Sequence, residues 1–284
     1  MTFFGRDALK MAHEIRLRVA RTVGVTISVG VSWNKIFAKL GSDYKKPNAV
    51  TEIARGNVCE IVWPLPVSDL LLVGRNTAQE LGKYGIHTIG ALANADEAFL
   101  LRQFGKLGGQ LHINACGLDA SPVARTGECA PAKSIGNGMT FRRDLCGESD
   151  IRVALTALAD SVASRMRRAG VECATVQVTL KDPTLKSVTR QKAVPPTRLA
   201  ADLARACLEL IRAGWPEGKP IRTLTVTAQH LLPAGEAPGQ ISLFDAPGDS
   251  LKAERLEEAV DHVRGRYGGK SIQHGSVMGN DLGI

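Results

Sequence analysis

The stretch CATVQVTLKDPTLKSVTRQKAV, residues 173–194, decides the fold of the second half of the chain. Its first run alternates Val176, Val178 and Leu180 with Thr and Gln residues, which is the pattern of a half-buried β-strand. The second run, KSVTRQKAV, is also rich in β-branched residues. The two runs predict strands over 172–181 and 186–194.

The segments on either side complete an alternating order of strands and helices. Two more strands are predicted over 134–143 and 220–231, and two helices over 149–169 and 198–213. The resulting βαββαβ order is typical of a four-stranded sheet with two helices on one face.

The other face of this sheet is predicted to be an uncovered platform of Thr, Gln, Lys and Arg. In the last strand, Thr223, Thr225 and Thr227 alternate with apolar residues, and Lys186, Arg190 and Lys192 are expected to point the same way. Hydroxyl donors and positive charge suit phosphate contacts, which need no shaped pocket. A plain solvated face is the alternative, but Arg165, Arg167 and Arg168 add further positive charge nearby.

The first 65 residues have a different pattern, which predicts part of an α/β layer. We expect a helix over 6–22, a strand over 23–32, a helix over 33–45 with Ser32 as its N-cap, and a short strand over 58–63.

The remaining segments are shorter. Residues 66–120 predict short helices separated by glycines, and 125–134 predict a linker. After a Pro- and Gly-rich segment, Leu251, Leu256, Val260, Val263 and Tyr267 predict a last amphipathic helix.

Composition and charge exclude several classes of protein. The 284 residues are 44% apolar and 23% charged, which argues against disorder. Residues 132–232 hold 16 Lys and Arg against 9 Asp and Glu, a net +7, whereas 233–284 hold 5 against 8, a net −3. The positive charge of the chain therefore gathers on the sheet-forming part, which indicates a polyanionic partner.

The sequence also indicates a cytoplasmic protein. It has no apolar run long enough to span a bilayer and no signal peptide. The six cysteines are scattered without a CxxC pair, as expected of reduced thiols in the cytoplasm. Neither the Cys nor the His pattern predicts a metal site.

Three short motifs are candidates for binding. VGRNTAQELGKYGI (73–86) has the pattern of a helix–hairpin–helix, in which a glycine turn aims backbone N–H groups at a phosphate and Thr77 and Lys83 assist; a plain helical hairpin is the alternative. The lysines of GSDYKKPN (41–48) by themselves only complement a helix end. QISLFD (240–245) is apolar enough to be a docking segment, unless it packs on its own domain.

Four segments together resemble the Y-family translesion DNA polymerases, the bacterial DNA polymerase IV and UmuC-like group. SVGVSWNKIFAKLGSDYKKPNA (28–49) is similar to the palm of that family and WPLPVSDLLLVGRNTAQELGKYGIHTIGALA (63–93) to its thumb. AKSIGNGMTFRRDL (132–145) resembles the start of the little finger, and QISLF (240–244) the peptide that docks on the sliding clamp.

The resemblance implies an α+β multidomain fold. It divides the chain into a partial palm (1–65), a helix–hairpin–helix thumb (66–124), a linker (125–133), a little finger (134–232), and a clamp-binding segment with a C-terminal helix (233–284). The implied activity is DNA-directed synthesis past damaged template in DNA repair and the SOS response. The implied partners are primer–template DNA, dNTPs and the sliding clamp (beta clamp), with the protein a monomer and no membrane involved.

The resemblance also assigns roles to residues. Lys46 matches a lysine that contacts the triphosphate of the incoming nucleotide. The residues that it assigns to clamp binding are Gln240, Leu243 and Phe244. Those assigned to DNA, with the basic residues of the predicted sheet, are Gly74, Arg75, Thr77, Lys83, Ser134, Ile135, Gly136, Arg142, Lys186, Arg190 and Lys192.

The chain departs from the family pattern at its N-terminus. In the family, an Asp on the first palm strand and a later Ser-x-Asp-Glu stretch bind two Mg²⁺ ions, and both precede the helix that corresponds to residues 6–22. We therefore expect the full-length enzyme to use Mg²⁺ and this chain, as an N-terminally truncated form, to retain no metal ligands or catalytic residues. A non-catalytic DNA- and clamp-binding module and, less favoured, a helix–hairpin–helix glycosylase are the alternatives.

Overall fold

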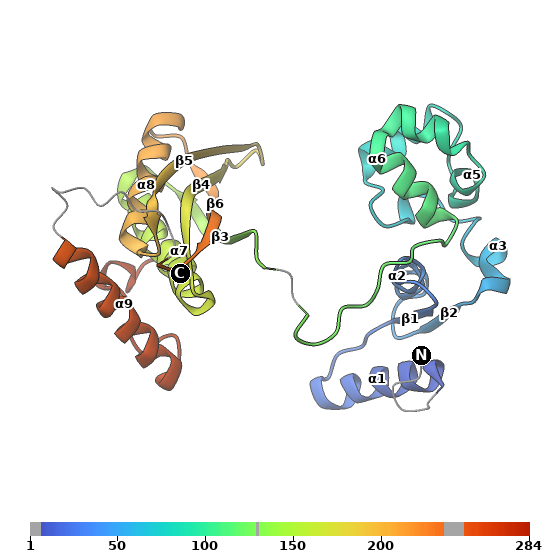
Figure 1. The fold of residues 1–284 in the computed structure, drawn as a ribbon, viewed down its shortest axis with the longest axis horizontal. Coiled ribbons are helices and arrows are strands. Elements are labelled where there is room, and N and C mark those ends of the chain that lie inside the picture. The colour runs from blue at the N-terminus through green and yellow to red at the C-terminus, as the bar shows by residue number, and fades with distance from the viewer. Residues whose placement is uncertain (1–6, 129–130, 236–246) are drawn as a thin grey trace. The chain divides into compact units, whose positions relative to one another are not determined.

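The computed structural model describes residues 7–128, 131–235 and 247–284 of the chain (Figure 1). The chain forms two compact units, Met1–Cys129 and Ala130–Ile284. The boundary between them lies within the segment 125–133. Each unit has its own hydrophobic core.

The first unit begins with two helices and two short strands. Helix α1 (Ala8–Val23) is followed by β1 (Val29–Ser32), α2 (Lys35–Tyr44) and β2 (Val50–Ile53), and the two strands pair in parallel from Val29 opposite Val50. The predicted N-cap at Ser32 is wrong. Asn34 caps α2 by accepting a hydrogen bond from the Phe37 amide at 2.8 Å, because Ser32 still belongs to β1 and its hydroxyl donates to the Ile53 carbonyl.

The strand predicted over 58–63 is also wrong. A 3₁₀ turn, η1 (Arg55–Asn57), and a short helix, α3 (Val58–Ile61), occupy this position, and the strand β2 lies earlier in the chain. The Asn57 side chain accepts from the Ala54 amide at 2.9 Å and so starts the helical turn. A short apolar run does not by itself distinguish a strand from a helix.

Helices make up the rest of the first unit. They are η2 (Val67–Asp69), α4 (Arg75–Gly82), α5 (Ile89–Ala93) and α6 (Glu97–Ala115), which is kinked at Gly105. Phe37 of α2 lies in the same core as Leu81 of α4 and Leu111 of α6. The residues predicted as palm and thumb therefore share one core.

The second unit contains a four-stranded antiparallel sheet in the order β3-β6-β4-β5. Its strands are β3 (Ser134–Leu145), β4 (Val171–Lys181), β5 (Ser187–Thr197) and β6 (Ile221–Pro233). Helix α7 (Gly147–Ala169) contacts β3 and β6, and α8 (Ala200–Gly214) contacts β5 and β4. The predicted βαββαβ order and the four-stranded sheet are confirmed.

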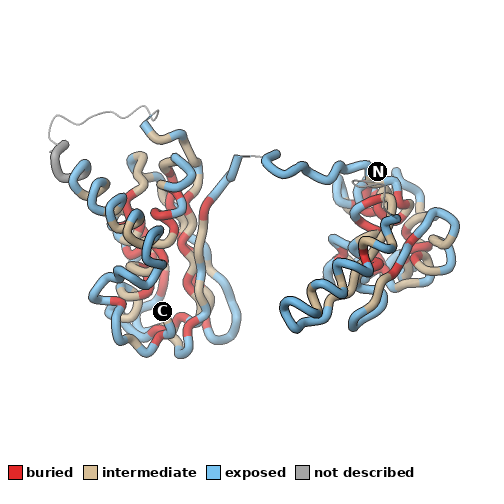
Figure 2. The backbone as a smooth tube through the Cα atoms, turned by 90° about the horizontal axis from the view of Figure 1, so that it is seen from below, coloured by how far each residue is buried: buried red, intermediate tan, exposed pale blue. Residues whose placement is uncertain are grey.

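The core of this unit lies between the sheet and the two helices, where buried segments face each other (Figure 2). Val176, Val178 and Leu180 of β4 are buried there, as are Leu224 and Val226 of β6. The alternation predicted for β4 and β6 is therefore confirmed, and Thr and Gln residues occupy the other face of both strands.

The prediction for the basic residues of β5 is wrong. Arg190 lies directly opposite Val178 and Lys192 opposite Val176, and directly opposite residues share a face of an antiparallel pair. Arg190 and Lys192 therefore lie on the helix-covered face. Lys192 pairs with Glu209 of α8 at 2.6 Å, and the Arg190 side chain lies beside Gly214.

The C-terminal segment covers further surface of the second unit. Helix α9 (Pro247–Tyr267) lies beside α7, and after a short turn, η3 (Gly275–Val277), the chain returns to the edge of β3. There the Arg142 amide donates to the Leu282 carbonyl, and the Leu282 side chain is buried in the core. No helix in the described parts of the chain is both long and apolar enough to cross a membrane.

Candidate nucleic-acid interface

One face of the four-stranded sheet is left open by the helices and is lined by uncharged polar side chains. We call this surface the open face; its central side chains are Thr140, Gln177, Thr179, Thr189, Gln191, Thr223, Thr225, Thr227 and Gln229. Cross-strand hydrogen bonds order several of them: Thr140 with Thr223 at 2.9 Å, Thr179 with Thr189 at 3.0 Å, and Gln229 to Gln177 at 2.9 Å. The face therefore presents a ladder of hydroxyl and amide groups.

Two glycines of β3 lie on the open face, so this part of the strand has no side chains there. Gly136 lies opposite Thr227 and Gly138 opposite Thr225. A Cβ atom at Gly138 would lie 2.2 Å from the Thr225 hydroxyl oxygen, and one at Gly136 would lie 2.8 Å from the Thr227 hydroxyl oxygen. Glycine is therefore required if the threonine side chains are to keep these positions, and the β3 backbone stays accessible.

Positive charge lies at the margins of the open face and not at its centre. Lys181 is opposite Thr223, so it belongs to this face at the end of β4. Arg165 of α7 donates to the Gly136 carbonyl at 2.8 Å and stays exposed. Arg167, by contrast, is buried against α9 with a side chain only 4% exposed, so it adds no charge to the open face.

The structure places the other predicted DNA-binding residues of this unit in different surroundings. Ser134 is exposed at the start of β3, whereas Ile135 is buried in the core, so only its backbone is accessible. Arg142 is exposed beside Gly283. Lys186 lies in the turn between β4 and β5, where its amide donates to Asp182.

The predicted helix–hairpin–helix turn begins α4. Gly74 is the N-cap residue, no side chain caps the helix, and Gly74, Arg75 and Asn76 are exposed. The first amides of a helix lack partners within the helix and carry its positive dipole end. Gly74, Arg75 and Thr77 lie together at this start of α4, while Lys83 lies at the opposite end of the helix and pairs with Glu80 at 2.6 Å.

Lys46 lines a cleft of about 430 Å³ at the end of α2. The side chain pairs with Asp43 at 2.7 Å, and Lys39 pairs with the other oxygen of the same carboxylate. Hydrogen bonds from Lys39 and Lys46 hold the pKa of Asp43 below its usual value. The sequence did not single out Lys39, whose role depends on its spacing of four residues from Asp43.

The charged groups of the cleft at Lys46 do not fit a magnesium centre. The carboxylate beside Lys46 is already neutralised by two lysines. Across residues 7–128, 131–235 and 247–284, no group of three or more His, Cys, Asp or Glu side chains is arranged to hold a metal ion. The clamp-binding candidates Gln240, Leu243 and Phe244 lie outside the described residues.

Known proteins match the second unit by a family model and nearly the whole chain by sequence identity. Residues 132–243 match the family model of the impB/mucB/samB family C-terminal domain, which covers the sheet of the second unit. The chain is 42% identical over 279 residues to DNA polymerase IV of Acetivibrio thermocellus, a match that covers 98% of this chain and 69% of the relative. DNA polymerase IV of Clostridium kluyveri is 33% identical over 97% of this chain and 70% of its own length.

A more distant relative, DNA polymerase IV 1 of Bacillus subtilis, is 32% identical over 98% of this chain and 66% of its own length. These matches extend through both units and not only the sheet. The chain therefore belongs to the Y-family DNA polymerases, in the DNA polymerase IV group.

Proposed function

We propose that the chain binds primer–template DNA, as part of a translesion polymerase that extends a primer past damaged template with dNTPs. The single observation that supports this most strongly is the open face, a broad surface of hydroxyl, amide and glycine backbone groups with cations at its margins. Such a surface suits the DNA backbone because phosphates are bound by Ser, Thr, Gln and backbone donors without a pocket.

The first unit supplies two further proposed contacts. The start of α4, with Gly74, Arg75 and Thr77, is suited to a backbone phosphate of the duplex. The cleft at Lys46 is suited to the triphosphate of the incoming nucleotide, because Lys39 and Lys46 both border it.

We also propose that Gln240, Leu243 and Phe244 bind the sliding clamp, a role that rests on the resemblance of QISLF to the family peptide. Replacing Leu243 and Phe244 with Ala is expected to abolish pull-down by the clamp, and unchanged pull-down would contradict this role.

The DNA-binding proposal is tested by fluorescence anisotropy with a labelled primer–template across a salt series. We expect affinity to fall steeply with salt, as for any protein that displaces counterions from phosphates. Thr225→Glu, which places a negative charge at the centre of the open face, should weaken binding about tenfold, a cost of ~1.4 kcal/mol. The matched control is Ala201→Glu, an exposed position on α8.

Equal effects of the two substitutions would show that only net charge matters. Binding without any salt dependence would contradict DNA binding by this chain.

A further inference from the structure

Helix α9 is attached to the second unit by ion pairs and not by a buried apolar stripe; its own contribution is mostly acidic, with Arg264 as the one basic residue, paired with Asp160 of α7 at 2.7 Å among the described residues. Of the five residues of the predicted apolar stripe, Leu251, Leu256 and Tyr267 are 54%, 66% and 67% exposed, and Val260 and Val263 are only partly buried. None of residues 251–267 is fully buried. This arrangement is unusual, because a surface helix ordinarily packs on its core through an apolar stripe.

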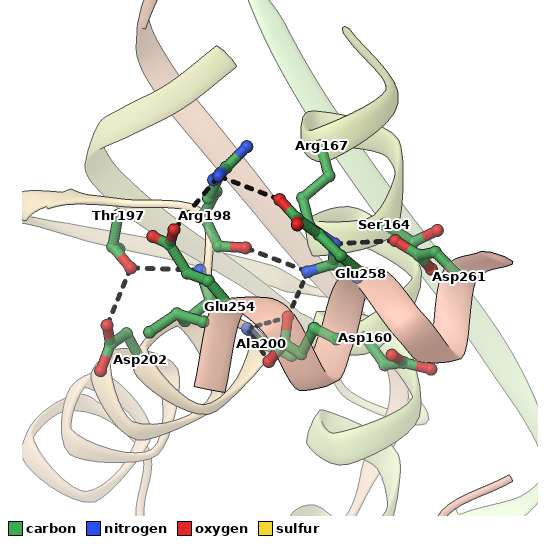
Figure 3. A network of polar contacts seen from close by, with 12 residues as sticks. Asp160, Ser164, Arg167, Thr197, Arg198, Ala200, Asp202, Glu254, Glu258 and Asp261 are labelled. Carbon is green, nitrogen blue, oxygen red and sulfur yellow. Dashed lines mark hydrogen bonds and ion pairs between the residues drawn. The ribbon is translucent and has the colours of Figure 1, made fainter. Parts of the chain in front are cut away.

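Two arginines of the second unit, Arg167 and Arg198, form ion pairs with carboxylates of α9 (Figure 3). Arg167 of α7 pairs with Glu257 and, at 2.7 Å, with Asp261. Glu257 also accepts a hydrogen bond from the Ala200 amide at the start of α8, at 3.0 Å. Burial raises the pKa of Glu257 although Arg167 lowers it.

Arg198, between β5 and α8, holds the next pair of carboxylates. It contacts Glu254 and Glu258, both at 3.1 Å. The acidic residues of α9 within 251–267 are therefore all engaged by arginines of the unit to which the helix is attached.

The outer side of α9 is left basic as a consequence. Lys252, Arg255, His262 and Arg266 are all exposed, and their spacing of three, seven and four residues places them along one side of the helix. Within the described part of the chain, Lys252, Arg255 and Arg266 have no carboxylate partner. We call these four residues the α9 stripe.

We propose that the α9 stripe binds the phosphate backbone of a nucleic-acid strand, as a second contact apart from the open face. At 1.5 Å per residue, the stripe runs about 21 Å along the helix. One strand of a duplex carries a phosphate about every 3.4 Å, so the stripe matches about six phosphates. A linear array of cations is complementary to such a linear polyanion.

An acidic protein surface fits the α9 stripe less well. The centres of protein–protein interfaces are depleted in charged residues and rich in aromatic ones. The stripe is mainly cationic, and the apolar residues beside it on this side of the helix are Leu256, Ala259 and Val263, none of which is aromatic. The proposal rests on DNA as the natural ligand of the chain, but it concerns a different surface from the one in the proposed function.

The test uses the full chain and compares two double variants of equal charge. Arg255→Gln with Arg266→Gln removes two cations of the stripe. Arg152→Gln with Arg205→Gln removes two exposed arginines of α7 and α8 that are paired with Glu148 and Asp202. Binding to labelled duplex and single-stranded oligonucleotides is measured across a salt series, with circular dichroism to check helix content.

The stripe variant is expected to bind at least one of the two oligonucleotides about tenfold or more weakly at ~0.1 M salt. Its salt slope should fall by about 1.8 for duplex or about 1.4 for a single strand. The control variant should bind as the unchanged chain does. The oligonucleotide that shows the larger change identifies the form of nucleic acid bound.

Equal losses in both variants, or an unchanged slope in the stripe variant, would overturn this proposal. The failure would be distinct from a failure of the proposed function, because Thr225→Glu would still weaken binding if the open face holds DNA. Loss of all DNA binding by the unchanged chain would overturn both proposals.

Discussion

Asp182 shows how one residue fixes the turn between β4 and β5, next to the open face. Its side chain is only 5% exposed. One carboxylate oxygen accepts from the Thr184 hydroxyl at 2.7 Å and from the Lys186 amide at 3.0 Å, and the other pairs with Lys219 at 2.9 Å. The hydrogen bond from Lys219, and to a smaller extent the one from Thr184, hold the pKa of Asp182 well below its usual value of 3.8.

We predict that Asp182→Asn lowers the thermal unfolding midpoint of the second unit by several degrees at neutral pH. A carboxylate with a lowered pKa contributes stability that is complete above its unfolded pKa and is lost as the pH falls toward the folded pKa. The difference between the two proteins should therefore shrink below about pH 4. Thermal unfolding followed by circular dichroism from pH 7 to pH 3 measures it.

The control for Asp182 is Glu217→Gln, an exposed position in the same unit. This variant should unfold as the unchanged chain does at neutral pH. A pH-independent difference for Asp182→Asn would show that the charge of Asp182 does not stabilise the turn.

Lys46 and its neighbour Lys45 provide a matched pair for the nucleotide site. Both are exposed, but only Lys46 lines the cleft and pairs with Asp43. We predict that Lys46→Ala weakens binding of a fluorescent dNTP about tenfold, since a hydrogen bond to a charged group contributes ~1.5 kcal/mol. Lys45→Ala should change the dissociation constant little, and equal effects would contradict the assignment.

At the scale of single elements, strands were easier to predict than the direction in which their polar residues point. The alternation of Val176, Val178 and Leu180 predicted the buried face of β4. Arg190 and Lys192 were placed on the wrong face, because the face of a strand depends on cross-strand register, which charge does not determine. The lysine pairs with Glu209, a residue distant in sequence.

The last helix shows a second limit at this scale. Periodicity predicted an amphipathic helix, but several of its apolar residues are exposed, and ion pairs attach the helix to the second unit instead. The cause lies in Arg167 and Arg198, which are far from α9 in the sequence. The residue pattern of one helix does not show which charged side chains lie on the surface that it packs against.

The ionic attachment of α9 leads to a prediction for its local stability. Glu257→Gln with Asp261→Asn would leave the Arg167 guanidinium buried without a counter-charge, at a cost on the order of 3 kcal/mol. We expect the amides of α9 to exchange hydrogen faster, while those of β4 and β6 are unchanged. Hydrogen exchange measured by mass spectrometry follows both sets of amides.

Glu258→Gln is the control, because Glu258 is half exposed and Arg198 retains Glu254 when it is replaced. It should affect exchange in α9 much less. If exchange in α9 were unchanged in the double variant, the ion pairs of Arg167 would not be what holds the helix.

At the scale of the whole molecule, the two units have separate cores and an exposed connection. Residues 120–128 and 131–134 are exposed, and they include Arg125 and Lys133 as sites for trypsin. We predict that limited trypsin digestion yields two resistant fragments that correspond to the two units. Simultaneous degradation of the whole chain would contradict their independence; gel electrophoresis with mass spectrometry identifies the fragments.

Much of the molecule was predictable because its patterns are local. Alternating strands and two periodic helices predicted the second unit, and four ordered motifs indicated the family. The clustering of groups from different strands was not predictable: Gly138 lies opposite Thr225, and Lys181 lies opposite Thr223. Their positions follow from strand register, which appears only when the chain is folded.

The central claim is that the open face of the sheet binds primer–template DNA, and mapping the bound surface tests it most directly. Amide resonances of the isotope-labelled chain are recorded while unlabelled primer–template DNA is added. We predict that the largest shifts occur along Gly136–Thr140, Gln177–Thr179 and Thr223–Thr227. Shifts that spare these strands, or no shifts at DNA concentrations that saturate anisotropy, would contradict the claim.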